Sequence, residues 1–242
     1  MVSVPRGPEN MSAKKRPGYQ KPRGYDPARY QRPSLACDVV IFTWRRPRLL
    51  VLLIQRKNLP YRGYWALPGG FVEINEPLKA AATRELFEET GVKGVHLEEF
   101  GSFGDPDRDP RTRVISIAYL ALAPSGRIRP RAGDDAKAAR WFPAQKPPEL
   151  AFDHRLILER ALERLRESLL LSPSLFLLLP REFELKELKA LIQSLTNQVY
   201  PLPWFREKIL ATGILKSCGI GTYRVNQSRF KPGTLYFLFD NS

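Results

Sequence analysis

Apolar residues in the first two thirds of the chain form short runs separated by polar turns. The runs at 35–44 and 49–57 are rich in leucine and β-branched residues, and the RRPR between them predicts a hairpin. A strand with its turn is predicted over 94–103, and another strand over 114–123. Leucines then recur at spacings of three and four through 155–170, with Glu and Arg between them. This spacing predicts an amphipathic helix that packs on the strands and closes a first domain.

The C-terminal part has a different pattern, with two helices followed by two strands. Segments 182–195 and 203–215 are predicted to be helices. Segments 217–227 and 233–239 are predicted to be strands joined by a basic turn. Two helices followed by a two-stranded wing are typical of a winged helix. The leucine-rich stretch between the two parts, at 168–180, is too short to span a bilayer and is predicted to be a packed linker.

Composition and charge divide the chain into three regions. With 43% hydrophobic and 26% charged residues, the chain is typical of a soluble globular protein. The net charge is +14, which favours polyanionic partners, and residues 1–32 hold eight Lys or Arg against two acidic residues. We therefore expect a basic, disordered tail at 1–33, a first domain at 34–172 and a winged-helix-like domain at 173–242.

The two cysteines and the N-terminal sequence indicate in which cellular compartment the protein is expected. Cys37 and Cys218 are far apart and have no short metal-ligand spacing, which fits a reducing compartment better than a disulfide scaffold. No apolar signal region opens the sequence, and no apolar run is long enough to cross a membrane. We expect a cytoplasmic protein without membrane contact.

The stretch Gly69 to Val92, GGFVEINEPLKAAATRELFEETGV, carries the most chemistry. From Pro77 onward its residues favour a helix, and Gly91 is a typical helix stop. On that helix the carboxylates of Glu85, Glu88 and Glu89 lie close together, where they repel each other unless a cation lies among them. Mg²⁺ prefers oxygen ligands of this kind together with substrate phosphates. The two glycines at 69–70 let the backbone approach a ligand closely.

The same residues resemble a known family. From Gly70 the sequence has glycine, five residues, Glu76, seven residues, then Arg84-Glu85-Leu86, one residue, Glu88-Glu89, one residue and Gly91-Val92. This matches the whole Nudix box, with no fixed position substituted. The resemblance implies an α/β/α sandwich with a mixed sheet and a Mg²⁺ site, with Mn²⁺ as an alternative. It implies that the metal is bound by the side chains of Glu85, Glu88 and Glu89 and by the backbone carbonyl of Gly69. It also assigns catalytic roles to Glu85, Glu88 and Arg84, with Arg84 holding the glutamates by ion pairing.

The loop at 104–113 alternates aspartates and arginines between prolines, and an arginine fork suits diphosphate oxygens. The segment SFGDPDRDPRTRVISIAYLAL resembles ADP-ribose pyrophosphatases of the Nudix family and the Nudix-related transcriptional regulators of NAD metabolism. This resemblance implies hydrolysis of a nucleoside diphosphate derivative, such as a nucleotide sugar or dinucleotide. The favoured substrate is ADP-ribose, which would give AMP and ribose 5-phosphate. The residues predicted to bind substrate are Arg56, Gly70, Asp105, Arg108, Arg113 and Asp135. The general base stays open between Glu85, Asp105 and Asp135.

Two alternatives share these residues. The regulators end in a similar winged helix, so the chain could instead be an ADP-ribose-responsive DNA-binding regulator. The residues that would contact DNA are Arg206, Lys208, Arg224, Arg229 and Lys231. Where the regulators usually have a basic stretch, this chain has VYPLPWF, which weakens the DNA hypothesis. Oxidised nucleotides or dinucleoside polyphosphates are other substrates compatible with the box. The resemblance also implies a homodimer.

Overall fold

The computed structural model describes residues 24, 26, 29–124, 128–133 and 136–239. By its contacts the chain divides into two units, Met1–Arg32 and Pro33–Ser242. The predicted basic tail therefore lies almost entirely outside the described residues. The helices and strands described below all belong to Pro33–Ser242.

A seven-stranded mixed sheet forms the first part of this unit. Its strands are β1 (Ser34–Arg45), β2 (Arg48–Arg56), β3 (Trp65–Ala66), β4 (Gly69–Phe71), β5 (Leu97–Phe103), β6 (Val114–Ala123) and β7 (Ala136–Pro143). The order is β3-β2-β1-β6-β5, with β4 paired to β1 and β7 paired to β2. Among the described strand pairs of this sheet, β1 and β6 run parallel and the others are antiparallel. The predicted hairpin of the first two strands is confirmed.

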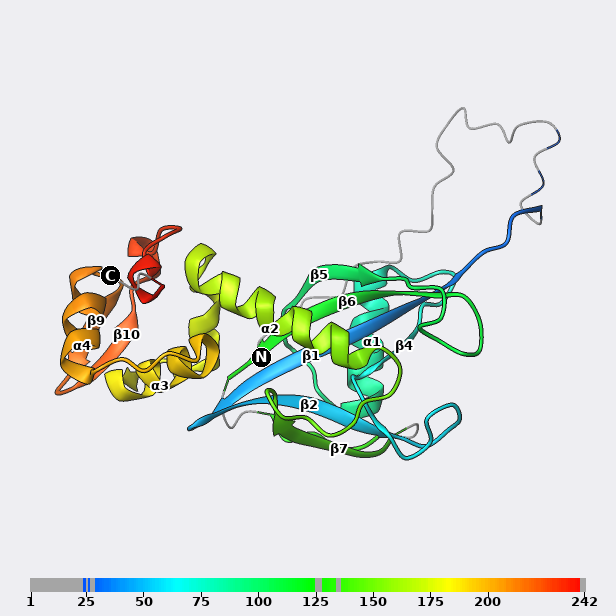
Figure 1. Cartoon of the computed structure of the whole chain (residues 1–242), viewed down its shortest axis with the longest axis horizontal. Helices are drawn as coiled ribbons and strands as arrows, with labels where there is room; N and C mark the ends of the chain where they lie inside the picture. Colours follow the sequence, from blue (N-terminus) through cyan, green and yellow to red (C-terminus); the bar gives the residue numbers. More distant parts are fainter. Residues whose placement is uncertain (1–23, 25, 27–28, 125–127, 134–135, 240–242) are drawn as a thin grey trace, which may run out of the picture. The chain divides into compact units, whose positions relative to one another are not determined.

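The sheet has a helix on each face because strand β1 is apolar on both sides. Alternate side chains of a strand point to opposite faces. Val39 and Ile41 belong to the core that includes Leu86 of helix α1 (Leu78–Thr90). Phe42 belongs to the other core, with Leu165 of helix α2 (His154–Leu171). Figure 1 shows α1 and α2 on opposite sides of the sheet, so the predicted α/β/α sandwich is confirmed.

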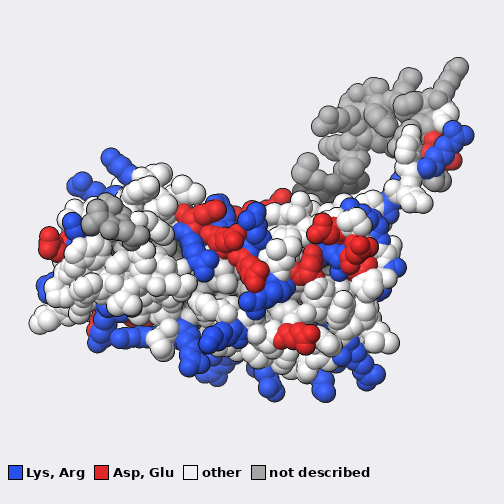
Figure 2. Space-filling view, viewed as in Figure 1, with Lys and Arg blue, Asp and Glu red and all other residues white. Residues whose placement is uncertain are grey.

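Helix α2 has the predicted amphipathic character. Its leucines at the predicted positions are buried, namely Leu158, Leu162, Leu165 and Leu169. Its outer face carries ion pairs within the helix, such as Arg155–Glu159 and Arg160–Glu163. Figure 2 shows acidic side chains gathered along this helix with basic side chains beside them. Among the described helices, none has the length and apolar character needed to cross a membrane.

The C-terminal part holds the predicted helices and a small sheet. A 3-10 helix, η2 (Pro173–Leu178), follows α2 and buries the linker side chains Leu175 and Leu178. Helices α3 (Leu185–Thr196) and α4 (Leu202–Ala211) come next. Strands β8 (Phe183–Glu184), β9 (Leu215–Gly219) and β10 (Thr222–Val225) form an antiparallel sheet in the order β8-β10-β9. One apolar core runs from the first sheet into this part, so the boundary at 172/173 stays a prediction.

The predicted strands of the wing are wrong in detail. Both β9 and β10 come from the segment around 217–227, which folds back at Ile220 and Gly221 instead of forming one strand. The segment 233–239 is not a strand but contains a 3-10 helix, η4 (Tyr236–Leu238), after η3 (Gln227–Arg229). Leu235 and Leu238, three residues apart, are buried there, which is a helical rather than an alternating spacing.

Candidate active site

Helix α1 has the predicted boundaries and places its carboxylates against strand β4. It begins after Pro77 and ends at Gly91, whose φ of 69° is left-handed and whose N–H donates to the carbonyl of Phe87. A Cβ atom on Gly70 would lie 2.5 Å from Oε1 of Glu85. One turn later, Glu89 Oε2 accepts a hydrogen bond from the N–H of Gly69 at 2.8 Å. Gly70 therefore leaves room for the Glu85 carboxylate, whereas Gly69 leaves room for strand β1 and binds Glu89 through its N–H.

Arg84 is the centre of an ion-pair network beside these carboxylates. Its guanidinium lies 2.6 Å from Glu76 Oε1, 2.7 Å from Glu85 Oε1 and 3.1 Å from Glu88 Oε2. It also donates to the carbonyl of Phe71, which fixes the loop before the helix. The hydrogen bond to Glu76 is the main cause that raises the pKa of Arg84 and keeps it charged. Arg84 thus holds together the box residues that are predicted to bind a metal.

Burial makes the ionised form of two of these carboxylates unfavourable. Burial first, and then the charges of Glu85 and Asp38, raise the pKa of Glu89 to about 8. Burial also raises the pKa of Glu85, against the lowering effect of Arg84. A divalent cation would relieve this repulsion, and carboxylate oxygens are the ligands that Mg²⁺ prefers. The residues of the box therefore fit a hard divalent cation.

The predicted metal set is not gathered around one point. In the part of the chain that the structure describes, no three Asp, Glu, His or Cys side chains converge in a way that could hold a metal ion. Glu85 and Glu88 share Arg84, while Glu89 bonds to the N–H of Gly69. The assignment of Glu85, Glu88, Glu89 and the Gly69 carbonyl to a metal stays a prediction.

A cavity of about 140 Å³ opens beside the box. Strand β1 contributes Asp38, β2 contributes Arg56, and the box contributes Gly69, Gly70 and Glu89. The loop before β6 and the start of α2 complete the lining, with Arg108, Asp109, Arg111, Phe152 and His154. Ligand cavities are commonly about 300–1,000 Å³, so this cavity is smaller than a typical small-molecule site. The ring of Phe71, which also lines it, is partly exposed.

Asp38 anchors a buried polar network under the cavity. It accepts hydrogen bonds from Ser116 at 2.5 Å and from Arg108 at 3.4 Å. Arg108 also forms a bidentate pair with Asp153, at 2.6 and 2.8 Å. This pairing positions the loop before β6 against the start of α2.

His154 completes this network as a neutral side chain. Its Nδ1 accepts the N–H of Leu67 at 2.9 Å, so the proton must lie on Nε2, which is 3.4 Å from Asp38 Oδ1. Burial lowers the pKa of His154, although Asp38 acts in the opposite direction. The histidine therefore carries no charge into the cavity wall at neutral pH.

Two arginines and two phenylalanines form the mouth of the cavity. The guanidinium of Arg111 lies 5.2 Å from the ring centre of Phe71 and 5.7 Å from that of Phe152. Arg56 lies 4.8 Å from the centre of the Phe152 ring. Phe152 has a φ of 54°, a left-handed conformation that is rare for a bulky residue and is often found at functional sites. This group offers cations and flat apolar surface side by side.

The NUDIX domain family matches residues 33–163, more than half of the chain. The chain belongs to this family. The predicted family, and with it the class of Nudix pyrophosphohydrolase, is confirmed.

Several relatives of this Nudix protein have known activities or partners. The chain is 43% identical over 130 residues to an ADP-ribose pyrophosphatase of Methanocaldococcus jannaschii. That alignment covers 54% of this chain and 73% of the pyrophosphatase. The chain is 31% identical over 196 residues to the ADPR responsive transcriptional repressor NtrR of Acinetobacter baylyi, covering 79% of this chain and 78% of the repressor.

A solved structure with similar architecture extends the likeness to the C-terminal part. Shewanella oneidensis NrtR complexed with a 27mer DNA superposes with a TM-score of 0.66 and 29% identity, over 84% of this chain and 95% of that one. The NUDIX domain of the same protein complexed with ADP ribose superposes with a TM-score of 0.53 and 35% identity, over 59% of this chain and 94% of that one.

The structure brings together only part of the predicted substrate set of this Nudix domain. Arg56, Gly70 and Arg108 line the cavity, although Arg108 is paired with Asp153. Asp105 is exposed and lies outside the lining, and Arg113 donates instead to the carbonyl of Gly104. Asp135 lies outside the described residues. The roles of all six stay predictions.

Sequence reasoning missed six charged, aromatic or histidine residues of the cavity, namely Asp38, Phe71, Asp109, Arg111, Phe152 and His154. Asp38 and His154 lie far apart in the chain, and Arg111 looks like its two neighbouring arginines. Phe152 lies in an LAFDH segment that the sequence analysis did not use as a site. The one signal available was Asp38, an acid within an otherwise apolar strand. A buried charge needs a partner and therefore marks a structured site.

Proposed function

We propose that this protein hydrolyses the pyrophosphate bond of ADP-ribose, with water, to AMP and ribose 5-phosphate in a Mg²⁺-dependent reaction. Nudix hydrolases generally use divalent metals, and Mg²⁺, or Mn²⁺ in its place, is the proposed ion. The observation that carries the proposal is the pair of carboxylates, Glu85 and Glu89, packed against the two glycines beside an arginine-lined cavity. The likeness to an ADP-ribose pyrophosphatase and to an ADP-ribose-bound NUDIX domain supports ADP-ribose as the substrate.

Each group of side chains has a proposed task. Glu85, Glu88, Glu89 and the Gly69 carbonyl would hold the ion. A bound ion supplies positive charge for the diphosphate and makes a water molecule more acidic. Arg84 positions the glutamates through its ion pairs. The carboxylate that removes the proton from water remains open between Glu85, Asp105 and Asp135.

The mouth of the cavity would bind the rest of the substrate. Arg56 and Arg111 carry guanidinium groups that suit diphosphate oxygens. Arg111 forms a bidentate pair with Asp109, at 2.7 and 3.0 Å, and would share its guanidinium between Asp109 and the substrate. The rings of Phe71 and Phe152 lie beside them and offer apolar faces for a nucleobase. Arg108 has a different task, because its side chain is buried and its guanidinium pairs with both Asp153 and Asp38, which makes it a positioning residue. The side chain of Arg111, in contrast, is 42% exposed.

A substrate screen tests this function. The full chain with Mg²⁺ is offered ADP-ribose, NADH, dinucleoside polyphosphates and nucleoside triphosphates, and the products are separated by chromatography. ADP-ribose should have the highest kcat/KM, and Glu89→Gln should lower its turnover by about a thousandfold, since each ~1.4 kcal/mol of transition-state stabilisation is tenfold in rate. Glu149→Gln, at an exposed position outside the cavity, is the matched control. A preference for another substrate, or wild-type turnover by Glu89→Gln, would exclude the proposal.

A second function, sequence-selective DNA binding, is favoured by the C-terminal part. All five predicted DNA contacts are exposed, with Arg206 and Lys208 on α4, Arg224 on β10, and Arg229 and Lys231 after it. Within the described residues, none of the five takes part in an ion pair. The DNA-bound relative covers this region as well, which supports the proposal.

Two properties test the proposed DNA binding: preference for a particular DNA sequence, and release of that DNA by ADP-ribose. Salt-sensitive binding to any duplex follows from charge alone and would not support it. The full chain should select a preferred sequence from a pool of genomic fragments, and ADP-ribose should release it. Arg206→Ala should weaken that complex, whereas Arg155→Ala on α2 should not. Recovery of no preferred sequence would reject this function.

Assembly and location are proposals of the same kind. We propose a homodimer, which light scattering of the purified chain would check. We also propose a cytoplasmic location, because Cys37 and Cys218 are both free thiols.

A further inference from the structure

A second cavity, larger than the one beside the Nudix box, lies away from the carboxylates of the box. It has a volume of about 780 Å³ and lies where the wing, the η2 linker and the end of β6 meet. We call it the linker cavity and define it by Phe176, Phe183 and Val225 together with Arg181, Lys216 and Arg224. Its volume is within the range of about 300–1,000 Å³ that is typical of small-molecule sites. The functions proposed above do not use it as a cavity.

Its charge is all of one sign. Arg181, Lys216 and Arg224 line it, and none of the described lining residues is acidic. In the described part of the chain, none of these three side chains forms an ion pair or a hydrogen bond. An anion would find three unpaired cations here.

Two of these cations face each other across the wing. Arg224 on β10 is the direct partner of Lys216 on β9 in the antiparallel register. Side chains that are directly opposite lie about 5 Å apart at Cβ on one face of the sheet, and like charges in such a pair are destabilising. A bound anion would remove this repulsion.

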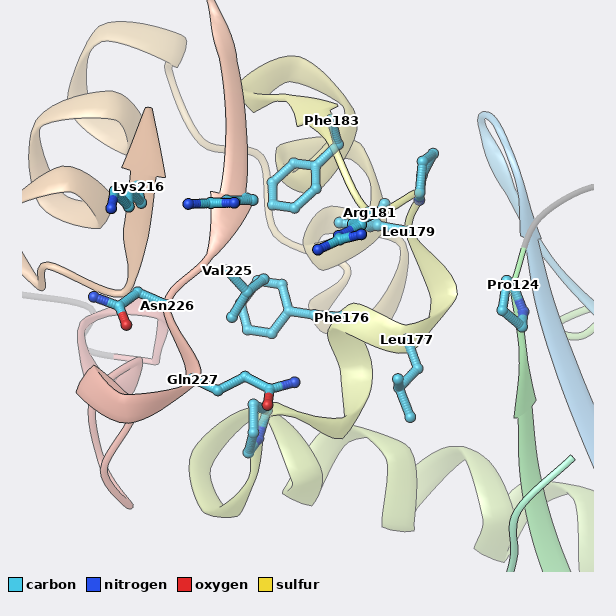
Figure 3. Close-up of a pocket in the computed structure, with 13 residues that line it drawn as sticks. Pro124, Phe176, Leu177, Leu179, Arg181, Phe183, Lys216, Val225, Asn226 and Gln227 are labelled. Atoms are coloured by element: carbon cyan, nitrogen blue, oxygen red, sulfur yellow. The ribbon is translucent and has the colours of Figure 1, made fainter. Parts of the chain in front are cut away.

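Most of the remaining lining is apolar. Phe176 and Phe183 are buried and their rings stack at 6.4 Å between centres. Figure 3 shows Phe176, Phe183 and Val225 between Lys216 on one side and Arg181 on the other. Asn226 lies on the same side as Lys216, and the side chain of Gln227 runs below Phe176 in this view. The cavity therefore combines a cationic rim with an apolar floor.

We propose that the linker cavity binds a small molecule that carries both a phosphate group and an apolar group. The phosphate would lie between Arg181 and Arg224, and the apolar group would lie against Phe176 and Val225. Lys216 would lie across these apolar side chains from Arg181, within reach of the other end of the ligand. Because the residues come from the wing and from the linker, such a ligand would tie these two segments together. The linker cavity shares no lining residue with the Nudix cavity. The proposal can therefore be tested independently of ADP-ribose hydrolysis.

Pyridoxal 5′-phosphate is a suitable probe because it has a phosphate, an aromatic ring and an aldehyde. The aldehyde condenses with the Nζ amine of a lysine, releasing water, and borohydride then reduces the imine to a stable secondary amine. The full chain is labelled over a range of concentrations, and the modified lysines are located by peptide mass spectrometry. Lys216 should reach half-labelling at a concentration roughly tenfold lower than Lys208 and Lys231, as expected for one added charge-assisted hydrogen bond. Those two lysines are exposed in the same part of the chain but do not line the cavity.

Variants and competitors make the result decisive. Arg181→Ser should raise the half-labelling concentration of Lys216 about tenfold, the effect of losing one such contact. Arg229→Ser, which removes an exposed arginine outside the cavity, should leave it unchanged. Pyridoxal without the phosphate should show no preference for Lys216, and inorganic phosphate should protect it from the phosphorylated probe. Thermal unfolding of each variant verifies that these exposed substitutions leave the fold intact.

Three outcomes would overturn the proposal. The first is equal labelling of Lys216, Lys208 and Lys231 by the phosphorylated probe. The second is labelling of Lys216 that does not change in Arg181→Ser. The third is protection of Lys216 by a random-sequence duplex whose affinity falls in Arg181→Ser by the same factor as labelling, which would assign the cavity to the DNA backbone instead of a small molecule.

Discussion

Gly70 and Glu85 occupy adjoining space that no larger residue at position 70 could share. An added Cβ would lie 2.5 Å from Oε1 and 2.6 Å from the carboxyl carbon of Glu85. The glycine at the start of the Nudix box is thus explained by a carboxylate fifteen residues later in the sequence.

Gly70→Ala should therefore displace the Glu85 carboxylate and lower kcat. A misplacement of about 1 Å at a reacting centre can cost about a hundredfold in rate, and we expect a loss of that size with ADP-ribose as substrate. Gly101→Ala is the control, because its Cβ would meet its nearest atom at an ordinary 3.7 Å. If Gly70→Ala retains wild-type kcat, the position of Glu85 is not required for hydrolysis.

Arg111 and Arg113 should differ in substrate binding although they are two residues apart. Arg111 lines the Nudix cavity, where it is also paired with Asp109, whereas Arg113 bonds to the carbonyl of Gly104 outside the cavity. Loss of a charge-assisted hydrogen bond to phosphate costs about 1.5–3 kcal/mol, so Arg111→Gln should raise KM by roughly tenfold or more. Arg113→Gln should leave KM nearly unchanged. Steady-state kinetics on both variants decides the matter, and the reverse ranking would restore the prediction from sequence for Arg113.

His154 should make the stability of the fold depend on pH. Its pKa in the folded protein is lowered from the ordinary value of 6.5 because it is buried. Below about pH 6.5 the unfolded chain therefore binds a proton that the folded chain does not, and the free energy of unfolding falls by up to about 1.4 kcal/mol per pH unit. Above this range the histidine is neutral in both states and has no such effect.

Urea denaturation between pH 7.5 and 5.5 measures this effect. His154→Gln should have a shallower pH dependence than the wild type. His96, the only other histidine, is exposed, so His96→Gln should keep the wild-type slope. Equal slopes for the wild type and His154→Gln would show that this histidine does not couple protonation to folding.

Two leucines of helix α2 should differ in their contribution to stability. Leu165 is fully buried against the sheet, whereas Leu156 is 45% exposed on the same helix. Leu165→Ala should lower the free energy of unfolding by about 2–5 kcal/mol, the usual cost of a cavity in a core. Leu156→Ala should cost much less, within about 1 kcal/mol. A similar midpoint shift for both variants in urea would contradict the described packing of α2.

Some elements could be predicted because their signal is local. The leucine spacing of α2, the hairpin of β1 and β2, and the helix stop at Gly91 depend only on neighbouring residues. The strands of the wing were predicted wrongly because the prediction also used only neighbouring residues. The segment 217–227 has strand-forming residues, but the turn at Ile220 and Gly221 divides it between two strands. The apolar segment 233–239 was mistaken for a strand because a short apolar run does not reveal its period.

The sequence by itself determined the family, the α/β sandwich and the positions of the charged residues along α1. A motif of fixed spacing on one helix can be recognised from neighbouring residues alone. Only the tertiary structure decided which distant side chains meet it. It placed Asp38, Arg111, Phe152 and His154 around one cavity, left Arg113 outside, and paired Arg108 with Asp153. The physical reason is that charges buried together must pair with whatever the folded chain brings near, and spacing along the sequence does not encode that proximity.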